Sequence, residues 1–142
     1  MEREYLIRLP WPPSKTSKNG PQGDWRGKAT AARSYKADCL WECMRQGVKA
    51  SVADNAAVEI TYHPPREGRF DWDNISARAK QGFDAVAEAV GIDDGNWWPV
   101  TLHRGQKLKH GCVMIHIRPG AGAVKLPLKG GISGGDKLAS NA

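Results

Sequence analysis

Residues 57–62 read Ala57-Val58-Glu59-Ile60-Thr61-Tyr62, and His63 and two prolines follow. From Val58 onward apolar and polar side chains alternate, so that in an extended chain the apolar ones share one face. Proline cannot donate a hydrogen bond to a sheet ladder, and a strand is therefore expected to end before Pro64-Pro65. The stretch predicts a half-buried strand around which a sheet can form.

A helix is predicted on either side of this strand in the chain. Residues 30–46 place apolar side chains on one helical face, start at Thr30 as a plausible N-cap and stop at Gly47. Residues 76–89 show the same helical periodicity and stop at Gly91.

Three more stretches favour strands. Residues 5–9 alternate and are followed by Pro10, while residues 100–104 and 112–117 flank a Gly- and Lys-rich connection and predict a hairpin. The element order is then β-α-β-α-β-β. This order predicts an α/β fold, with one mixed sheet and both helices packed on one face.

The length of 142 residues favours one domain. We expect that domain to span residues 1–118, with a long loop over residues 10–27. Residues 119–142 are rich in Gly, Pro and Lys and predict a flexible tail. The glycines of this tail do not form a phosphate-binding loop, because no Gly-Lys-Ser/Thr follows them.

The net charge of +6 is unevenly distributed. Residues 1–49 carry +5, residues 50–117 carry −2 and residues 118–142 carry +3. Basic segments attract polyanions, whereas carboxylates inside such a surface repel them unless a divalent cation lies between. This distribution is typical of a metal-dependent nuclease, although a small positive charge is also common in proteins that bind no nucleic acid.

Membrane and export signals are not found in the sequence. No apolar run approaches the roughly 18 residues of a membrane span, and Met1 to Glu4 lack the start of a signal peptide. The three cysteines have no ligand spacing for zinc, so we expect them to be reduced and buried. These features predict a cytoplasmic protein without a membrane partner.

The most informative pentapeptide is Phe70-Asp71-Trp72-Asp73-Asn74. In an extended segment Asp71 and Asp73 point the same way, and Trp72 points oppositely, towards the core. Two such carboxylates repel each other unless a cation neutralises them, and hard oxygen ligands suit Mg²⁺. The segment predicts a magnesium site.

Three other interpretations of this pentapeptide compete. A calcium loop lacks its turn glycine, because Ser76 stands there. Asp73 or Asn74 is also a plausible cap for the following helix. The last alternative is a solvated turn.

A second acidic pair, Asp93-Asp94, follows the second predicted helix, and Lys80 lies between the two pairs. A cation beside a metal-bound phosphate stabilises developing negative charge. A helix over residues 76–89 would be about 21 Å long, and the five residues that follow recover at most roughly 17 Å. Either the helix begins later, near Ala79, or a second subunit brings the acidic groups together.

Together these motifs resemble the RusA family of Holliday junction resolvases, small nucleases common in prophages. The similarity spans about residues 4–118 and is carried by Leu9-Pro10-Trp11-Pro12-Pro13-Ser14, Asp71-x-Asp73-Asn74, Lys80-x-x-Phe83-Asp84-Ala85 and Gly91-Ile92-Asp93-Asp94.

The resemblance implies a homodimeric endonuclease that resolves four-way DNA junctions by paired symmetric nicks in recombination and repair. It implies that Asp71, Asp73 and Asp94 are catalytic and bind Mg²⁺, with Mn²⁺ as a substitute, and that Lys80 is the catalytic basic residue. Lys80 lies three residues further from the Asp-x-Asp-Asn motif than in the founding member, which leaves Arg78 as an alternative. The loop after Pro13 is also longer.

Basic side chains near these motifs are candidates for DNA contact. Some lie on or beside a loop that carries Trp11 and Trp25, a combination suited to phosphate contact and base stacking. Others lie immediately before Asp71. The predicted DNA-binding residues are Lys15, Lys18, Arg26, Arg66, Arg69 and Arg78. Of the four histidines, only His63 is a candidate for a water-orienting base.

Two other functional classes stay open at this point. One is a less selective branched-DNA nuclease that acts on flaps, forks or single strands. The other is a catalytically silent DNA-binding module on the same fold.

Overall fold

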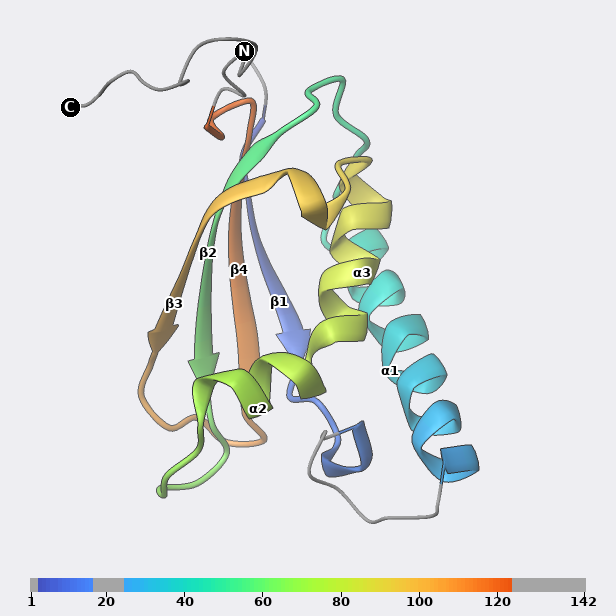
Figure 1. Ribbon diagram of the computed structural model, residues 1–142, viewed down its shortest axis with the longest axis vertical. Helices are drawn as coiled ribbons and strands as arrows, with labels where there is room; N and C mark the ends of the chain where they lie inside the picture. The colour runs from blue at the N-terminus through green and yellow to red at the C-terminus, as the bar shows by residue number, and fades with distance from the viewer. Residues whose placement is uncertain (1–2, 17–24, 124–142) are drawn as a thin grey trace, which may run out of the picture.

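A computed structural model describes residues 3–16 and 25–123 (Figure 1). The elements in chain order are β1 (Tyr5–Pro10), the 3-10 helix η1 (Ser14–Thr16), α1 (Trp25–Arg45), β2 (Ala56–His63), α2 (Trp72–Arg78), α3 (Lys80–Val90), the 3-10 helix η2 (Asp94–Asn96), β3 (Trp97–Arg104) and β4 (Cys112–Pro119). The predicted α/β fold is confirmed as a small domain with a four-stranded mixed sheet and three α-helices.

The strands lie in the order β1-β4-β2-β3. β4 is antiparallel to both β1 and β2, while β2 and β3 are parallel. The predicted hairpin of residues 100–104 and 112–117 is therefore wrong, because β2 lies between the two strands. The burial of each strand explains this order: Val113, Ile115 and Ile117 of β4 are fully buried, as a central strand requires, whereas β3 is mostly exposed, as an edge strand tolerates.

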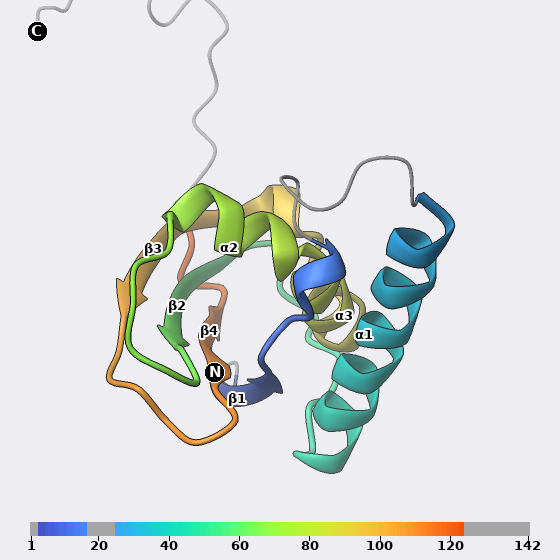
Figure 2. The same ribbon diagram turned by 90° about the horizontal axis from the view of Figure 1, so that it is seen from below.

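The helices α1 and α3 pack against each other and cover one face of the sheet (Figures 1 and 2). Their close approach depends on Gly82, where an added Cβ would lie 3.1 Å from Leu9 Cδ1 and 3.1 Å from Tyr35 Cε2. The prediction that two helices pack on one face of the sheet is thus confirmed. The core between them and the sheet combines inward side chains of β1, β2 and β4 with buried side chains of α1 and α3.

The predicted single helix over residues 76–89 is wrong, because the chain forms α2 and α3 with a break at Ala79. Ala79 has φ −89° and ψ 0°, is completely buried, and ends one helix as it begins the next. Because neighbouring residues are good helix formers, local propensity does not reveal the break. Ala79 and the neighbouring Ile75 are both buried in the core at this break.

Other predicted boundaries moved by a few residues. The first helix starts at Trp25 instead of residue 30, and residues 14–16 of the expected loop form η1. Residues 17–24 and 124–142, and with them most of the predicted tail, lie outside the described residues. Residues 119–123 continue from β4 and donate backbone hydrogen bonds to Asn55 and Trp98.

None of the helices within the described residues is long and apolar enough to cross a membrane. The three cysteines, Cys39, Cys43 and Cys112, are free and buried, which confirms the prediction for them.

Burial raises the pKa of Cys39 from the ordinary value of 9.0 to about 12, and that of Cys43 to about 11. An unfolded thiol therefore loses its proton at a lower pH than the folded one, so the stability that these thiols add below pH 9 is lost as the pH rises towards 11–12.

We expect the free energy of unfolding, measured in urea, to fall between pH 9 and pH 11 in the native sequence. The fall should be smaller in the Cys39→Ala/Cys43→Ala variant, in which these two thiols cannot titrate. An equal fall in the free energy of unfolding in both proteins would contradict the assignment of this pH dependence to Cys39 and Cys43.

Candidate functional site

The segment that carries Asp71 and Asp73 is not extended throughout. Asp71 has extended backbone angles and is the N-cap residue of α2, but Trp72 and Asp73 already belong to the helix. The two carboxylates therefore do not alternate along a strand as predicted. Trp72 is also 69% exposed and does not anchor the segment to the core.

Phe70 anchors this segment instead. Its ring packs edge to face with Trp11 at 5.9 Å and with Tyr62 at 6.4 Å between ring centroids, and Trp11 and Tyr62 lie 6.5 Å apart. Edge-to-face geometry is the arrangement that aromatic quadrupoles favour. This cluster, Trp11-Tyr62-Phe70, joins the segment after β1, the end of β2 and the segment before α2.

Two arginines complete the attachment of this region. The guanidinium of Arg104, at the end of β3, lies 4.3 Å from the ring centroid of Phe70 and donates a hydrogen bond to the carbonyl of Gly68. The guanidinium of Arg78 lies 5.8 Å from the Trp11 ring and donates to the Pro12 carbonyl at 2.7 Å. Sequence reasoning missed Arg104, because nothing local indicates that the end of β3 meets residues 68–70.

Asp71 and Asp73 are both exposed at the start of α2. Arg69 Nη2 lies 3.6 Å from Asp71 Oδ1, but the Arg69 side chain is 90% exposed, so this pair adds little stability. The other arginine of the loop, Arg66, is also exposed. The structure therefore presents both carboxylates to solvent, with Arg69 beside Asp71.

Lys80 begins α3 and joins two acidic side chains. Its Nζ donates to Asp84 Oδ1 and to Asp94 Oδ2, each at 2.6 Å. Partial burial lowers the pKa of Lys80, but the bonds to Asp84 and Asp94 outweigh it and raise the pKa above its ordinary value. Lys80 is therefore a permanent cation near neutral pH.

The contact between Lys80 and Asp94 does not decide between the two arrangements left open by the sequence, because those concerned how the two acidic pairs meet. The helix does begin later, at Lys80, and the same chain brings Asp94 to it. No second subunit is needed to join these two residues.

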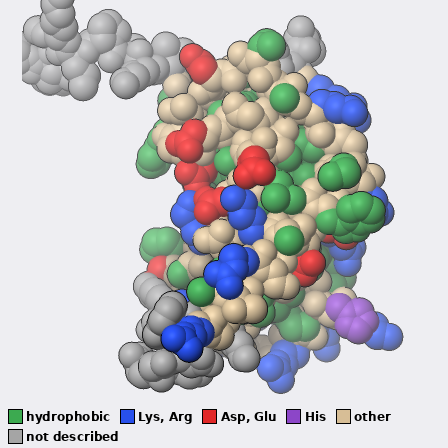
Figure 3. All heavy atoms as spheres, turned by 90° about the vertical axis from the view of Figure 1, so that its right-hand side faces the viewer, with side chains coloured by type: hydrophobic (Ala, Val, Ile, Leu, Met, Phe, Trp, Pro, Cys, Tyr) green, Lys and Arg blue, Asp and Glu red, His purple; other side chains and the backbone are tan. Residues whose placement is uncertain are grey.

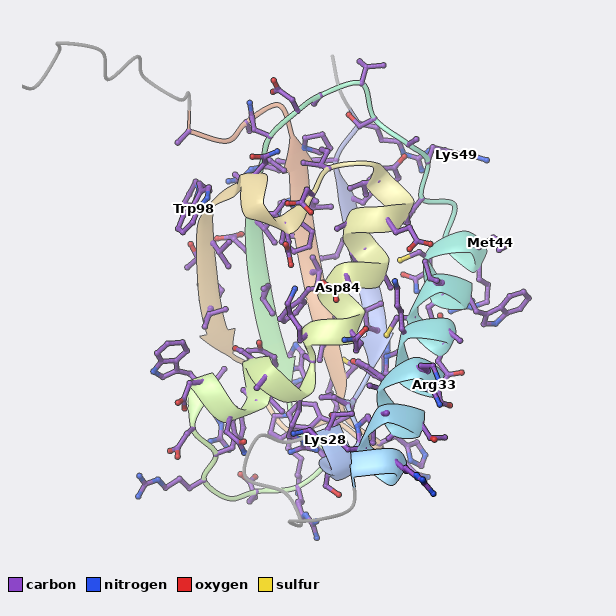
Figure 4. The ribbon with its side chains drawn as sticks, turned by 45° about the vertical axis from the view of Figure 1, so that its right-hand side comes forward. Lys28, Arg33, Met44, Lys49, Asp84 and Trp98 are labelled. Atoms are coloured by element: carbon purple, nitrogen blue, oxygen red, sulfur yellow. The ribbon has the colours of Figure 1, made fainter. Side chains whose placement is uncertain are left out.

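Beside Lys80 the surface forms an open acidic hollow of about 260 Å³, lined by Asp84, Ala87, Glu88, Asp93 and Asp94. Figure 4 labels Asp84 on α3, and in Figure 3 most acidic side chains gather in the upper half of this face and most basic ones in the lower half. Glu88 also pairs with Lys36 at 3.2 Å. The carboxylates outnumber the lysines here, so the hollow is net negative.

The two acidic pairs lie at different ends of the sheet. α2 lies across the end at which β2 finishes, whereas η2 precedes the start of β3 (Figure 1). Within residues 3–16 and 25–123, no three His, Cys, Asp or Glu side chains are grouped to hold a metal ion. The described chain alone does not bring Asp71, Asp73 and Asp94 into one cluster.

The predicted DNA-binding residues divide into three groups. Lys18 and the side chain of Lys15 lie outside what the structure describes. Arg26, Arg66 and Arg69 are exposed, with Arg26 at the start of α1. Arg78 is half-buried against Trp11, so it holds the Pro-rich segment instead of facing solvent.

His63 is held by a loop. Its Nδ1 lies 2.9 Å from the carbonyl oxygen of Gln106, which ties the ring to residues 105–111. This contact gives His63 a structural role in the described fold.

Comparison with known proteins identifies a relative. Over 114 residues the chain is 32% identical to an uncharacterized protein from Xylella fastidiosa strain Temecula1, an alignment that covers 78% of this chain and 74% of the relative. No family model matches the chain. Because the relative's name states no activity, the function has to be argued from the site.

Arg104→Ala should release residues 64–70 from the end of β3. Loss of the hydrogen bond and of the cation–π contact costs about 1 kcal/mol of local stability, which corresponds to roughly a fivefold larger open population. Trypsin should then cut after Arg66 and Arg69 about five times faster, because cleavage follows the open population. Lys107→Ala, which removes a neighbouring exposed charge without touching Gly68, is the matched control, and equal cleavage rates in the two variants would contradict this role.

Proposed function

The chain belongs to the same family as the uncharacterized Xylella fastidiosa protein, and we propose that it is a Mg²⁺-dependent endonuclease of the RusA type. The proposed reaction is the resolution of four-way DNA junctions by paired symmetric nicks in recombination and repair. The proposed catalytic residues are Asp71, Asp73, Asp94 and Lys80.

The observation that carries this proposal is the exposure of Asp71 and Asp73 on a firmly attached segment, with Arg69 beside Asp71. An exposed carboxylate at the surface is open to a cation and a phosphate. The Trp11-Tyr62-Phe70 cluster holds Phe70, the residue directly before Asp71, in place. A catalytic group needs such support from its neighbours.

The donor chemistry of these residues fits Mg²⁺. Mg²⁺ in phosphoryl-transfer sites is usually held by one or two carboxylates together with water and substrate phosphate, so a ready group of three protein ligands is not required. Asp71 and Asp73 would hold it, and Asp94 would join them from the second subunit of the proposed dimer, with Mn²⁺ as a substitute for Mg²⁺. When bound, the ion supplies charge neutralisation and an activated water for phosphodiester hydrolysis.

Lys80 contributes positive charge in this proposal. Its raised pKa keeps it protonated, so it cannot accept a proton from water near neutral pH. Its proposed role is to stabilise negative charge on the phosphate or on the leaving oxygen. The bonds to Asp84 and Asp94 hold its ammonium group in place for this role.

We propose a homodimer and a cytoplasmic location, where cellular DNA is accessible. The dimer is supported by the exposed apolar side chains of Trp98 and Val100 on β3, which is an edge strand. Figure 4 labels Trp98 at this edge. Sedimentation measures the mass directly.

A labelled four-way junction incubated with the protein and Mg²⁺ should yield symmetric nicks, and EDTA should abolish them. Asp71→Asn should lower the single-turnover rate on the order of 10²-fold or more, because it removes a negative ligand without changing shape. The Asp54→Asn variant carries the same change at an exposed position outside the site, and it should cut at the native rate. An Asp71→Asn variant that cuts as fast as Asp54→Asn would overturn the catalytic assignment.

Substrate choice separates the functional classes. Equal rates on junctions, forks, flaps and single strands would identify the less selective nuclease. Binding without cleavage at any Mg²⁺ or Mn²⁺ concentration would identify the silent DNA-binding module.

A further inference from the structure

Two loops at the end of the sheet are joined into one unit. The first, residues 64–70, connects β2 to α2, and the second, residues 105–111, connects β3 to β4. Leu108 N donates to Pro64 O at 3.0 Å, and Gly105 N donates to Tyr62 O at 2.8 Å. Figure 2 views this end, with the two loops side by side. We call residues 64–70 and 105–111 the double loop.

Glycines make this close approach possible. Gly111 has φ +68°, and a Cβ there would lie 2.9 Å from Pro65 Cδ and 3.1 Å from His63 O. A Cβ on Gly105 would collide with the ring of His63. Both positions therefore exclude ordinary side chains, and the loops are held in contact by their backbones.

The double loop, together with Arg104 at its edge, is strongly basic. Only Glu67 is acidic in these stretches. Lys107, Lys109 and Arg66 are exposed and form no ion pair or hydrogen bond with the described residues. The five basic residues are Arg66, Arg69, Arg104, Lys107 and Lys109.

We propose that the double loop is a phosphate-binding surface for DNA, with Lys107 and Lys109 as contacts in addition to Arg66 and Arg69. The loop of residues 64–70 leads directly into Asp71. A DNA backbone held at this loop would therefore lie next to the exposed carboxylate of Asp71. Exposed cations on a fixed backbone suit phosphate oxygens, and such contacts carry no sequence information. The inference rests on the proposed function in taking DNA as the ligand.

The test compares Lys107→Ala/Lys109→Ala with native protein, in EDTA so that no cleavage occurs. The probes are a fluorescein-labelled four-way junction and a linear duplex of the same length. Each lost phosphate contact lowers the slope of log Kobs against log salt by about 0.9, so the double variant should lose about 1.8 on the duplex. The affinity for the junction should fall together with that for the duplex.

Arg45→Ala/Lys49→Ala is the matched control, because it removes two exposed positive charges at the C-terminal end of α1, away from the double loop. Lys49 is labelled there in Figure 4. This control should keep the native slope. Circular dichroism and thermal unfolding check that both variants remain folded, as expected for exposed positions.

The inference and the proposed function fail in different ways. A Lys107→Ala/Lys109→Ala slope equal to the native or control slope overturns the inference, even if the protein cleaves junctions in Mg²⁺. A slope loss of about 1.8 supports the inference even if no cleavage is found. Native protein that binds neither probe overturns both.

Discussion

The contact among Trp11, Tyr62 and Phe70 is the constraint on which the arrangement of the candidate site depends. Each ring comes from a different part of the chain, and together they fix the segment after β1 and the start of α2 to the end of β2. The guanidinium of Arg78 lies over the ring of Trp11, and that of Arg104 lies over the ring of Phe70. The position of Asp71 follows from this packing, because Asp71 comes directly after the anchored Phe70 in the chain.

Much of the fold could be predicted from the sequence, because burial leaves a periodic pattern. Residues 5–9 and 57–62 were predicted from their alternation, and both form strands in the sheet. Strand order could not be predicted in the same way. The connection of residues 105–111 is as compatible with a hairpin as with a crossing past β2. Which of the two forms depends on which strands are buried enough to lie in the middle of the sheet.

The break at Ala79 shows a second limit, and it matters for the site. Alanine is a strong helix former, so the residues around it predict one helix. Ala79 stands between the two helices and is buried in the core together with Ile75 of α2. The resemblance implied site roles for Lys80 and Asp94, and the structure brings their side chains together at 2.6 Å. Arg104, Lys107 and Lys109 were missed for the opposite reason, because a basic residue in a loop has no local signature of what lies beside it.

The net charge of +6 conceals two surfaces of opposite sign. Around Lys80, the carboxylates of Asp84, Glu88, Asp93 and Asp94 outnumber the lysines and repel a phosphate. At the double loop the excess is positive, and it attracts one. A polyanion should therefore associate first through the double loop, in a step that monovalent salt weakens. Its approach to the carboxylates requires their neutralisation, in a step that depends on a divalent cation. In the proposed function, binding and chemistry would thus be under the control of different ions, because the fold places the two charge excesses on different elements.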